Sequence, residues 1–538
     1  MIHLSGGTTL KKYSYRKYLA HVIPCFGYGI FCGAVAGALI FFFKLLAEHL
    51  EEISEHIYHM AKEDTLVKIL LFAGLIGFAS IMYLLHKRAP EAKGGGIPRS
   101  EGILRGVLSF KWIRTLFGTI FGSMISFFCG VPLGSEGPSV LIGTTVGHLC
   151  RKPSKEKGAW DRYVMTGGAA AAFSVATGSP FTAIIFALEE VHKRFTPMLV
   201  LVASSSVLAA TAVNNTLCSL FNINPILFDL GIVEKLELQH TGYILLLAVL
   251  VSLAVGIFDI AVAKFGQLMK KLGKFFPNYA KILLVFLLTG VIGLIFTEGL
   301  YSGRGIILDI VNGEKAISFL AIMLVIRVGM MLLTTSSGVT GGIFIPTLAI
   351  GALFGALSAE LLVAIGMPES LFGTVVLLAM CAFMGGTMRA PLTAAAFFIE
   401  STAQFTNMFY VALVIFIVNF ATEVFNRKPF YDSVLEDMEE VQNHGIRRRI
   451  VRFEMKVSEN AFVVGKSVRD ILWPHSGVVS SIVRGSDAHR IMDNDGEKRL
   501  YVGDTITLRA QIYNEEETVQ YLYSLVGNDY DIHSREIE

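Results

Sequence analysis

The sequence predicts a mainly α-helical protein that crosses a membrane many times, built from two related halves with broken helices and followed by a small α+β domain. Three observations support this prediction. The 538 residues are 53% hydrophobic and only 17% charged, with a mean hydropathy of +0.58, whereas soluble domains carry about 25% charged residues. Two glycine-rich apolar stretches are related to each other. After about Tyr431 the chain becomes strongly charged and then alternates between apolar and polar residues.

The N-terminal segment favours a retained membrane span over a cleaved signal peptide. Four basic residues lie within residues 1–19, and no charged residue occurs from Val22 to Phe43. This run is too long for the core of a signal peptide, and no small-residue cleavage site ends it convincingly. The positive-inside rule therefore predicts that residues 1–19 are a cytoplasmic N-terminus.

Apolar segments recur along the chain, and several are shorter than the roughly 20 residues that a straight span needs. Beside glycine-rich breaks, such short segments favour half-helices or strongly tilted helices. A more polar stretch at 222–240 is expected to join the two halves, which are placed at about 20–225 and 240–430. The apolar segments lie near 20–43, 68–85, 107–134, 139–149, 164–188, 198–221, 241–263, 281–298, 317–334, 343–366, 371–383, 391–399 and 408–422.

An internal duplication supports the organisation into two halves. Phe128–Gly147 and Ser336–Gly355 share glycines, a valine, a proline and an isoleucine when the first stretch is shifted by 208 positions. A second pair, Gly178–Glu189 and Arg389–Glu400, aligns with an offset of 211. Simple repeats of Gly and Ala in membrane helices readily mimic one such match, but they less readily mimic both matches.

The composition of these stretches suits an anion inside a membrane. Glu136 is the one acid of the first stretch, and a charged side chain in lipid is costly enough to be functional by default. Glycines let the chain leave a helix and turn N–H groups toward a ligand. Helices that start at or near Pro138 and Pro346 would direct their positive N-terminal ends at that ligand. Inverted halves whose broken helices meet at the midplane are a known transporter plan.

Four motifs carry a resemblance to a known family. GGGIP at 94–98, GSEGP at 134–138, GGIFIP at 341–346 and KPFY at 428–431 resemble the anion-site motifs of the CLC chloride channel and transporter family. The resemblance covers roughly residues 20–435, with the motifs in the right order. It implies a CLC-type membrane domain that transports ions and is not an enzyme. It also implies a homodimer in membrane lipid, with one anion pathway in each subunit.

The resemblance assigns roles to the motif residues. Glu136 matches the gating glutamate, whose carboxylate occupies an anion site when ionised and swings away when protonated. Ile343 and Phe344 match positions whose backbone N–H groups face the central anion, and Tyr431 matches the tyrosine whose hydroxyl donates to it from the inner side. Without the resemblance, a lone tyrosine after proline is more often an interfacial anchor, and the GGIF glycines fit helix packing equally well. The predicted anion-binding residues are Gly95, Ile97, Gly134, Ser135, Gly137, Ile343, Phe344 and Tyr431, with no metal site.

Two positions depart from the family pattern. The middle residue of the first motif is commonly a serine whose hydroxyl contacts the central anion, and here it is Gly95. A lost donor to a charged ligand costs about 1–3 kcal/mol unless water replaces it, so the preferred anion stays open. Ser135 stands where a basic residue is common, which reduces the positive potential at the outer mouth.

A pair of acids favours an exchanger over a channel. Glu190, which follows Glu189 and lies ten residues after Pro180, matches the cytoplasmic-side proton glutamate of the family's exchangers. Chloride/proton antiport is therefore the expected function, with chloride and protons as the transported ions. Two alternatives stay open. One is a voltage- or pH-gated chloride channel without proton coupling, in which Glu190 is only a charged helix end. The other is an exchanger for another anion, such as nitrate or fluoride.

The tail is predicted to be a small α+β domain that follows a charged linker at 436–449. Residues 450–530 resemble the C-terminal module of regulator-of-potassium-conductance proteins, the TrkA-C or RCK-C type, through GKSVRDI at 465–471, VVSSIVRGSD at 478–487 and LYVGDTITL at 500–508. The expected elements are strands at Ile450–Val457, Gly477–Val483, Arg499–Val502 and Thr505–Gln511, turns at Asn494-Asp495-Gly496 and Gly503-Asp504, and a helix at Glu515–Val526.

This second resemblance has implications for regulation and for the source of the chain. Such modules dimerise and often bind a small ligand, cyclic di-AMP in some relatives. The resemblance implies regulation of transport by a nucleotide of this kind, with no other cofactor. It also implies a bacterial cell membrane, with both termini in the cytoplasm.

Other functional classes fit the sequence less well. A potassium channel or its regulator would need a TVGYG-like filter or a glycine-rich dinucleotide fingerprint, and the sequence has neither. Clusters of histidine and acids with metal-ligand spacing are missing, which argues against a membrane enzyme. The net charge of +2 implies no nucleic-acid partner, and the six scattered cysteines are interpreted as reduced packing residues.

Overall fold

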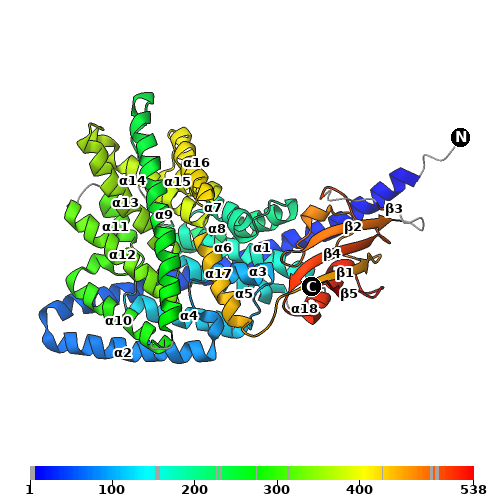
Figure 1. Ribbon diagram of the computed structural model, residues 1–538, viewed down its shortest axis with the longest axis horizontal. Coiled ribbons are helices and arrows are strands. Elements are labelled where there is room, and N and C mark those ends of the chain that lie inside the picture. Colours follow the sequence, from blue (N-terminus) through cyan, green and yellow to red (C-terminus); the bar gives the residue numbers. More distant parts are fainter. Residues whose placement is uncertain are drawn as a thin grey trace.

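A body of helices makes up most of the molecule, and a small sheet lies at one end of it (Figure 1). The structure is a computed structural model that describes residues 6–151, 158–225, 228, 233–273, 276–311, 316–426, 428–484, 489–490 and 496–537. Eight helices in these ranges are long and apolar enough to cross a membrane. The predicted fold class, a helical multi-pass membrane protein with a small α+β domain, is confirmed.

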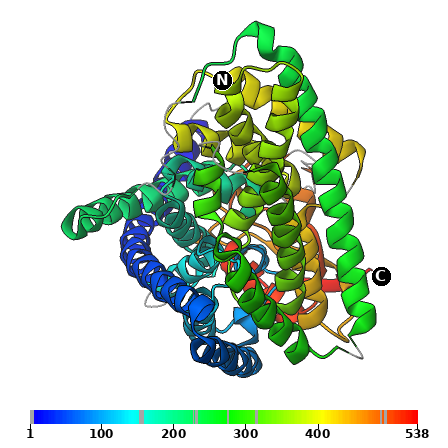
Figure 2. The same ribbon diagram turned by 90° about the vertical axis from the view of Figure 1, so that its left-hand side faces the viewer.

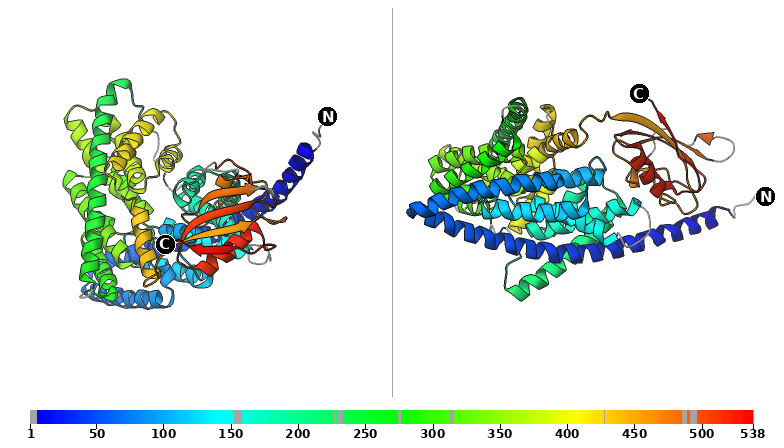
Figure 3. Two further views of the ribbon diagram at one scale, coloured as in Figure 1. Left: turned by 45° about the vertical axis from the view of Figure 1, so that its right-hand side comes forward. Right: turned by 90° about the horizontal axis from the view of Figure 1, so that it is seen from below.

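The first half of the membrane domain consists of long helices and short, broken ones. Helix α1 runs along the whole molecule, from the end near the sheet to the opposite end, where α2 turns back beside it (Figure 3). The helices of this half are α1 (Gly6–Glu63), α2 (Thr65–Arg88), α3 (Ile97–Arg105), α4 (Trp112–Phe128), α5 (Glu136–Arg151), α6 (Ala159–Thr177), α7 (Pro180–Phe186), which continues as a π-helical turn (Ala187–Val191), and α8 (Pro197–Phe221).

Two elements of this half differ from the predicted segments. Helix α1 extends well beyond the expected span at 20–43, because no glycine or proline interrupts residues 44–63. The chain turns only at Asp64, whose carboxylate accepts a hydrogen bond from the Leu66 N–H (2.7 Å) and caps α2. The segment expected at 107–134 is helical only within α4, since Gly130 adopts a positive φ of 74° and ends the helix.

The second half repeats the helix order of the first, and the two halves lie side by side in Figure 2. Helices α5 and α13 begin 208 residues apart, and α7 and α15 begin 211 residues apart, the two offsets found in the sequence. This correspondence confirms the internal duplication. The helices are α9 (Thr241–Leu272), α10 (Asn278–Ile295), α11 (Arg304–Val311), α12 (Ile317–Ser337), α13 (Phe344–Ala364), α14 (Phe372–Met388), α15 (Pro391–Thr402) and α16 (Met408–Val424).

Helix α17 (Phe430–Gln442) leaves the membrane domain toward the sheet. Its last turns occupy part of the stretch that the sequence assigned to a charged linker at 436–449. On these turns Asp437 (2.8 Å) and Glu440 (2.9 Å) pair with Lys270, at the end of α9. The connection from α17 to the first strand is therefore short.

The C-terminal domain is an antiparallel sheet in the order β3-β2-β4-β1-β5 with one helix, α18. Most of its predicted elements are confirmed, but the strand expected at Arg499–Val502 is wrong. Only Arg499 forms a bridge, because the Asp504 carboxylate takes the Tyr501 N–H (2.8 Å) into a turn. Asn494 and Asp495 lie outside the described residues. The elements are β1 (Arg449–Lys456), β2 (Val478–Arg484), β3 (His489–Arg490), β4 (Thr505–Ile512), α18 (Glu515–Val526) and β5 (His533–Glu536).

The C-terminal domain is docked on the membrane domain at the start of α6. The Tyr163 hydroxyl donates a hydrogen bond to the Asp470 carbonyl (3.0 Å), and the rings of Trp160 and Phe462 meet edge to face with centroids 5.2 Å apart. These side chains belong to one continuous apolar cluster that also contains core residues of the sheet. The two domains thus share a packed interface in addition to the chain connection.

Candidate functional site

The two duplicated loops meet through their backbones. The Gly134 N–H donates to the Gly342 carbonyl (2.7 Å), and the Gly342 N–H donates back to the Gly134 carbonyl (2.6 Å). A Cβ atom on Gly342 would lie 2.7 Å from the Gly137 nitrogen, so a side chain does not fit there. Helices α5 and α13 begin directly after these loops, at Glu136 and Phe344. Their positive N-terminal ends are therefore brought to the same place.

The glycine loop at 94–96 joins the other two. The Gly94 N–H donates to the Gly338 carbonyl (3.0 Å), and the Gly341 N–H donates to the Gly94 carbonyl (3.4 Å). Gly96 adopts a positive φ of 74°, and a Cβ atom on it would overlap with the Gly137 carbonyl. Three of the four sequence motifs are therefore in direct backbone contact, although they come from positions far apart in the chain.

Two residues of the GGGIP motif differ in what they offer to an anion. The Ile97 N–H donates to the Gly95 carbonyl (2.8 Å), so it is already used within its own loop. A Cβ atom on Gly95 would lie 3.5 Å from Ile343 Cγ1, an ordinary van der Waals contact. A serine would fit at position 95. Because glycine is there instead, the side of the site that faces Ile343 has no hydroxyl.

Unused hydrogen-bond donors gather where these loops meet. No described residue accepts a hydrogen bond from the Ile343 or Phe344 N–H groups at the start of α13. The Tyr431 side chain on α17 is completely buried, and its hydroxyl has no hydrogen-bond partner among the described residues. The same is true of the Ser139 hydroxyl on α5, which the sequence did not single out. Because buried polar groups are nearly always hydrogen-bonded, these donors are available to an anion.

Glu136 lies at the start of α5, beside the bridge between the two loops. Its side chain is 2% exposed, and Oε1 accepts a hydrogen bond from the Ser135 hydroxyl (3.3 Å). Oε2 has no partner among the described residues and lies against Gly134, where a Cβ atom would collide with it. Lys44 on α1 and Arg304 on α11 interact electrostatically with this carboxylate. Positive charge near Glu136 therefore comes from these two helices, and not from position 135.

Glu190 lies on the π-helical turn that follows α7, a distortion that is frequent at functional sites. The residue is 1% exposed, and neither carboxylate oxygen has a hydrogen-bond partner among the described residues. Tyr431 interacts electrostatically with both Glu190 and Glu136. The structure thus brings both predicted acids near the same tyrosine.

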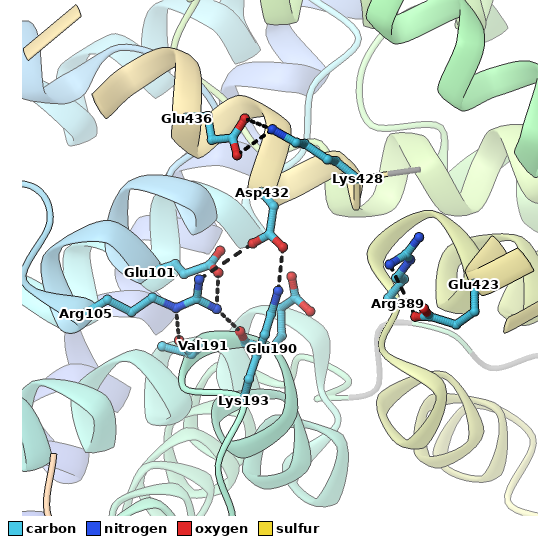
Figure 4. Close-up of polar contacts among 10 residues, drawn as sticks. All are labelled: Glu101, Arg105, Glu190, Val191, Lys193, Arg389, Glu423, Lys428, Asp432 and Glu436. Carbon is cyan, nitrogen blue, oxygen red and sulfur yellow. Dashed lines mark hydrogen bonds and ion pairs between the residues drawn. The ribbon is translucent and has the colours of Figure 1, made fainter. Parts of the chain in front are cut away.

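Arg105 holds the backbone around Glu190, a contact that the sequence analysis missed (Figure 4). Its Nε donates to the Val191 carbonyl (3.1 Å), and its Nη2 donates to the Glu190 carbonyl (3.3 Å). The same Nη2 lies 2.5 Å from Oε1 of Glu101, a completely buried acid on α3. An acid and an arginine four residues apart on a helix form a common surface pair. Their spacing in the sequence therefore did not predict that Arg105 contacts the backbone around Glu190.

Asp432, the residue after Tyr431, closes the same cluster from α17 (Figure 4). Its carboxylate pairs with Lys193 (2.7 Å) and with Arg105 (3.6 Å). Burial alone would raise the pKa of Asp432, but Lys193 and Arg105 outweigh it and hold the pKa below its usual value. The described residues contain no group of histidine, cysteine or acid side chains arranged to hold a metal ion.

Glu189, the first acid of the pair, has a structural contact. Its carboxylate accepts hydrogen bonds from the Leu392 and Thr393 N–H groups (2.9 and 2.7 Å) and from the Thr393 hydroxyl (2.8 Å), at the start of α15. Four unpaired N–H groups open every helix, and a carboxylate satisfies them well. The two neighbouring acids therefore differ in kind: Glu189 is a helix cap, whereas Glu190 is buried without a hydrogen-bond partner among the described residues.

Comparisons with known proteins agree with this architecture. The family profile described as "Voltage gated chloride channel" matches residues 76–423. A relative from Vibrio campbellii named "H(+)/Cl(-) exchange transporter ClcA" is 32% identical over 384 residues, which are 68% of this chain and 78% of the relative. The transporter of the same name from Salmonella arizonae is 26% identical over 394 residues, 72% of this chain and 81% of the relative.

Solved structures share the fold. A slow cyanobacterial Cl-/H+ antiporter superposes with a TM-score of 0.71 at 24% identity, covering 78% of this chain and 99% of the other. A CLC-type fluoride/proton antiporter superposes with a TM-score of 0.62 at 18% identity, covering 75% of this chain and 96% of the other. The motif-based resemblance is confirmed, and the chain belongs to the CLC family of voltage-gated chloride channels.

Proposed function

We propose that the chain exchanges chloride for protons across a bacterial cell membrane. The observation that carries the proposal is the position of Tyr431, whose buried hydroxyl has no hydrogen-bond partner among the described residues and which lies near both Glu136 and Glu190. This position supports a site for anions next to two acids that can carry protons. The relatives from Vibrio campbellii and Salmonella arizonae are both named H(+)/Cl(-) exchange transporters, which supports this function.

In the proposed exchange, the hydrogen-bond donors bind the anion and the two acids carry the proton. The anion accepts hydrogen bonds from the Tyr431 hydroxyl and from the free N–H groups of Ile343 and Phe344 at the positive end of α13. The ionised Glu136 carboxylate competes with anions for the donors at the start of α5, and protonation removes this competition. Glu190 exchanges protons with the cytoplasmic side. Movement of anions and of protons is coupled because both require Glu136 to change its charge and position.

A second candidate, exchange of another anion, is favoured by one observation. Gly95 provides no hydroxyl beside Ile343, so the site has one donor fewer than the common family pattern. Nitrate or fluoride would then compete well with chloride. The CLC-type fluoride/proton antiporter that shares the fold indicates that the architecture accommodates other anions.

We also propose that the protein is a homodimer with both termini in the cytoplasm, and that the C-terminal domain regulates transport. The resemblance to TrkA-C modules and the docking of the domain at Tyr163 support a regulatory role. Cyclic di-AMP is the first ligand to test. The domain contacts α6, and its described residues include none of the unpartnered donors named above, so its effect would be on the rate of transport and not on the pathway.

Purified protein in liposomes tests the exchange directly. An outward chloride gradient, with potassium and valinomycin to clamp the voltage, should drive protons into the vesicles against their gradient. Replacing chloride by nitrate or fluoride at equal concentration separates the two candidate functions. A protein that carries chloride at a high rate without any proton movement is a channel, and this result would rule out the proposal.

A further inference from the structure

We propose that Glu101 is a second proton-carrying residue, which passes protons between the cytoplasm and Glu190, and that Asp432 is the acid through which they reach it. This inference rests on the proposed chloride/proton exchange. Neither residue belongs to the motifs that identify the family. Both face Glu190 in the cluster formed by Glu101, Arg105, Glu190, Lys193 and Asp432, called here the acid cluster (Figure 4).

Glu190 needs a connection to water. It is 1% exposed, and Glu101 is completely buried as well. At the outer side of the acid cluster, the Lys193 and Asp432 side chains are 40% and 26% exposed. Asp432 is therefore the acid of the cluster that contacts solvent, and a proton that reaches Glu190 through these residues must pass it first.

The carboxylates of Glu101 and Asp432 both contact the Arg105 guanidinium, the first at Nη2 (2.5 Å) and the second at Nη1 (3.6 Å). Two carboxylates held beside one guanidinium repel each other, and a proton on one of them relieves this repulsion. Neither carboxylate oxygen of Glu101 has a hydrogen-bond partner among the described residues, so both are available to a proton. This pair of carboxylates forms the first link of a chain along which a proton can move.

The second link joins Glu101 to Glu190. Arg105 Nη2 contacts the Glu101 carboxylate and the Glu190 backbone carbonyl at once, which fixes the two residues side by side. Both side chains are buried, and none of their four carboxylate oxygens has a hydrogen-bond partner among the described residues. The groups that face Glu101 are Arg105 from α3, Glu190 and Lys193 from the turn and loop after α7, and Tyr431 and Asp432 from α17.

The charges of the acid cluster also require a proton. Two cations, Arg105 and Lys193, face three acids, Glu101, Glu190 and Asp432. The cluster is neutral only when one acid is protonated, and an uncompensated charge in a buried site is costly. A single proton shared among the three acids is therefore the stable state, as is typical of strongly coupled sites.

The proposed transfer moves one proton in three steps. Asp432 takes it from water and passes it to a Glu101 oxygen, and Asp432 becomes a carboxylate again. Glu101 then passes the proton to Glu190 and returns to the charged form. Arg105 and Lys193 keep their charges throughout and act as positioning residues.

The test uses the full-length protein in liposomes and measures chloride and proton fluxes separately. Glu101→Gln should lower the proton flux about tenfold and the chloride flux less, so that the ratio of protons to chloride falls; Glu101→Asp should restore part of it. Asp432→Asn should slow proton flux at a cytoplasmic pH of about 7.5 and recover it near about pH 5, where water delivers protons directly. Glu436→Gln is the matched control, since this acid lies one turn further along α17, 54% exposed and paired with Lys428.

The outcomes separate this inference from the proposed function. If the unmodified protein shows no chloride-driven proton uptake, the proposed function fails. If the unmodified protein is coupled but Glu101→Gln and Asp432→Asn keep its flux ratio and its pH profile, the inference is wrong. A loss of both fluxes in fixed proportion at every pH, in protein that elutes as the native species, would show that the acid cluster is only structural and would also overturn it.

Discussion

Glu189 and Glu400 occupy equivalent places in the two halves, and each caps the helix of the opposite half. Glu189 follows α7 and binds the first N–H groups of α15, while Glu400 lies in the last turn of α15 and binds the Phe181 and Thr182 N–H groups at the start of α7 (2.8 Å each). The two caps form a reciprocal clasp between the repeats. The clasp also fixes the start of the π-helical turn that carries Glu190.

The clasp predicts a loss of stability when either acid is neutralised. Glu189→Gln or Glu400→Gln should each lower the free energy of unfolding by about 1–2 kcal/mol, because a charged N-cap acceptor is lost. Thermal unfolding in detergent measures the effect. Glu423→Gln serves as control, since Glu423 pairs with Arg389 while 70% exposed. Equal melting temperatures for all three variants would contradict the role of the clasp.

Gly95 predicts a specific gain of affinity. Gly95→Ser should tighten chloride binding by about 1–3 kcal/mol, roughly 5- to 150-fold, because it adds a hydroxyl donor at a position with room for a side chain. Calorimetry with chloride and nitrate measures the ratio of affinities. Gly95→Ala is the matched control, as it adds the carbon atom without the donor. If the ratio is the same for glycine, alanine and serine, position 95 does not select the anion.

The C-terminal domain should lose stability in acid. Burial, together with Arg105 and Arg448, lowers the pKa of His475 to about 4 from its usual value of about 6.5. Between these values the unfolded chain binds a proton that the folded domain does not, so stability is present above about pH 6.5 and falls toward about pH 4. Melting temperatures across this range, compared with those of His475→Asn, measure the contribution. If the melting temperatures of the two proteins change with pH in the same way, His475 is not the source of the acid sensitivity.

Removal of the C-terminal domain tests its proposed regulatory role. A chain that ends at Gln442 keeps α17 intact and should still carry anions, with any response to cyclic di-AMP lost. Because truncation uncovers Trp160 and Tyr163, Tyr163→Phe is the milder variant. It removes only the hydrogen bond to the Asp470 carbonyl. A truncated protein that stays folded and dimeric but transports nothing would show that the domain does more than regulate.

Local signals explain which elements the sequence could predict. Helix α18 begins and ends where it was expected, because Asn514 caps its start and Gly527, with a φ of 87°, ends it. The meeting of the loops at Gly134 and Gly342 followed from the duplication, since two related loops in inverted halves need a common place. The length of α1 could not be judged, because the charged residues of its second part are as compatible with a loop as with a helix.

Contacts between distant segments explain what the sequence could not predict. In the sequence, Glu101 and Arg105 are ordinary neighbours on a helix, and Asp432 is the residue that follows the KPFY motif. Only the fold brings α3, the turn after α7 and α17 together and makes these residues the surroundings of Glu190. The strand expected at Arg499–Val502 failed for a related reason, as a side chain, Asp504, competes for the backbone N–H of Tyr501.

The most direct test of the account is the comparison of Glu136→Gln with the unmodified protein in chloride-loaded liposomes. The variant mimics the protonated gate, so it should carry chloride at a rate that no longer depends on pH, with no proton movement. The unmodified protein should take up protons against their gradient under the same conditions. Proton uptake by Glu136→Gln that matches the unmodified protein would contradict the assignment of Glu136 as the residue that couples the two ions.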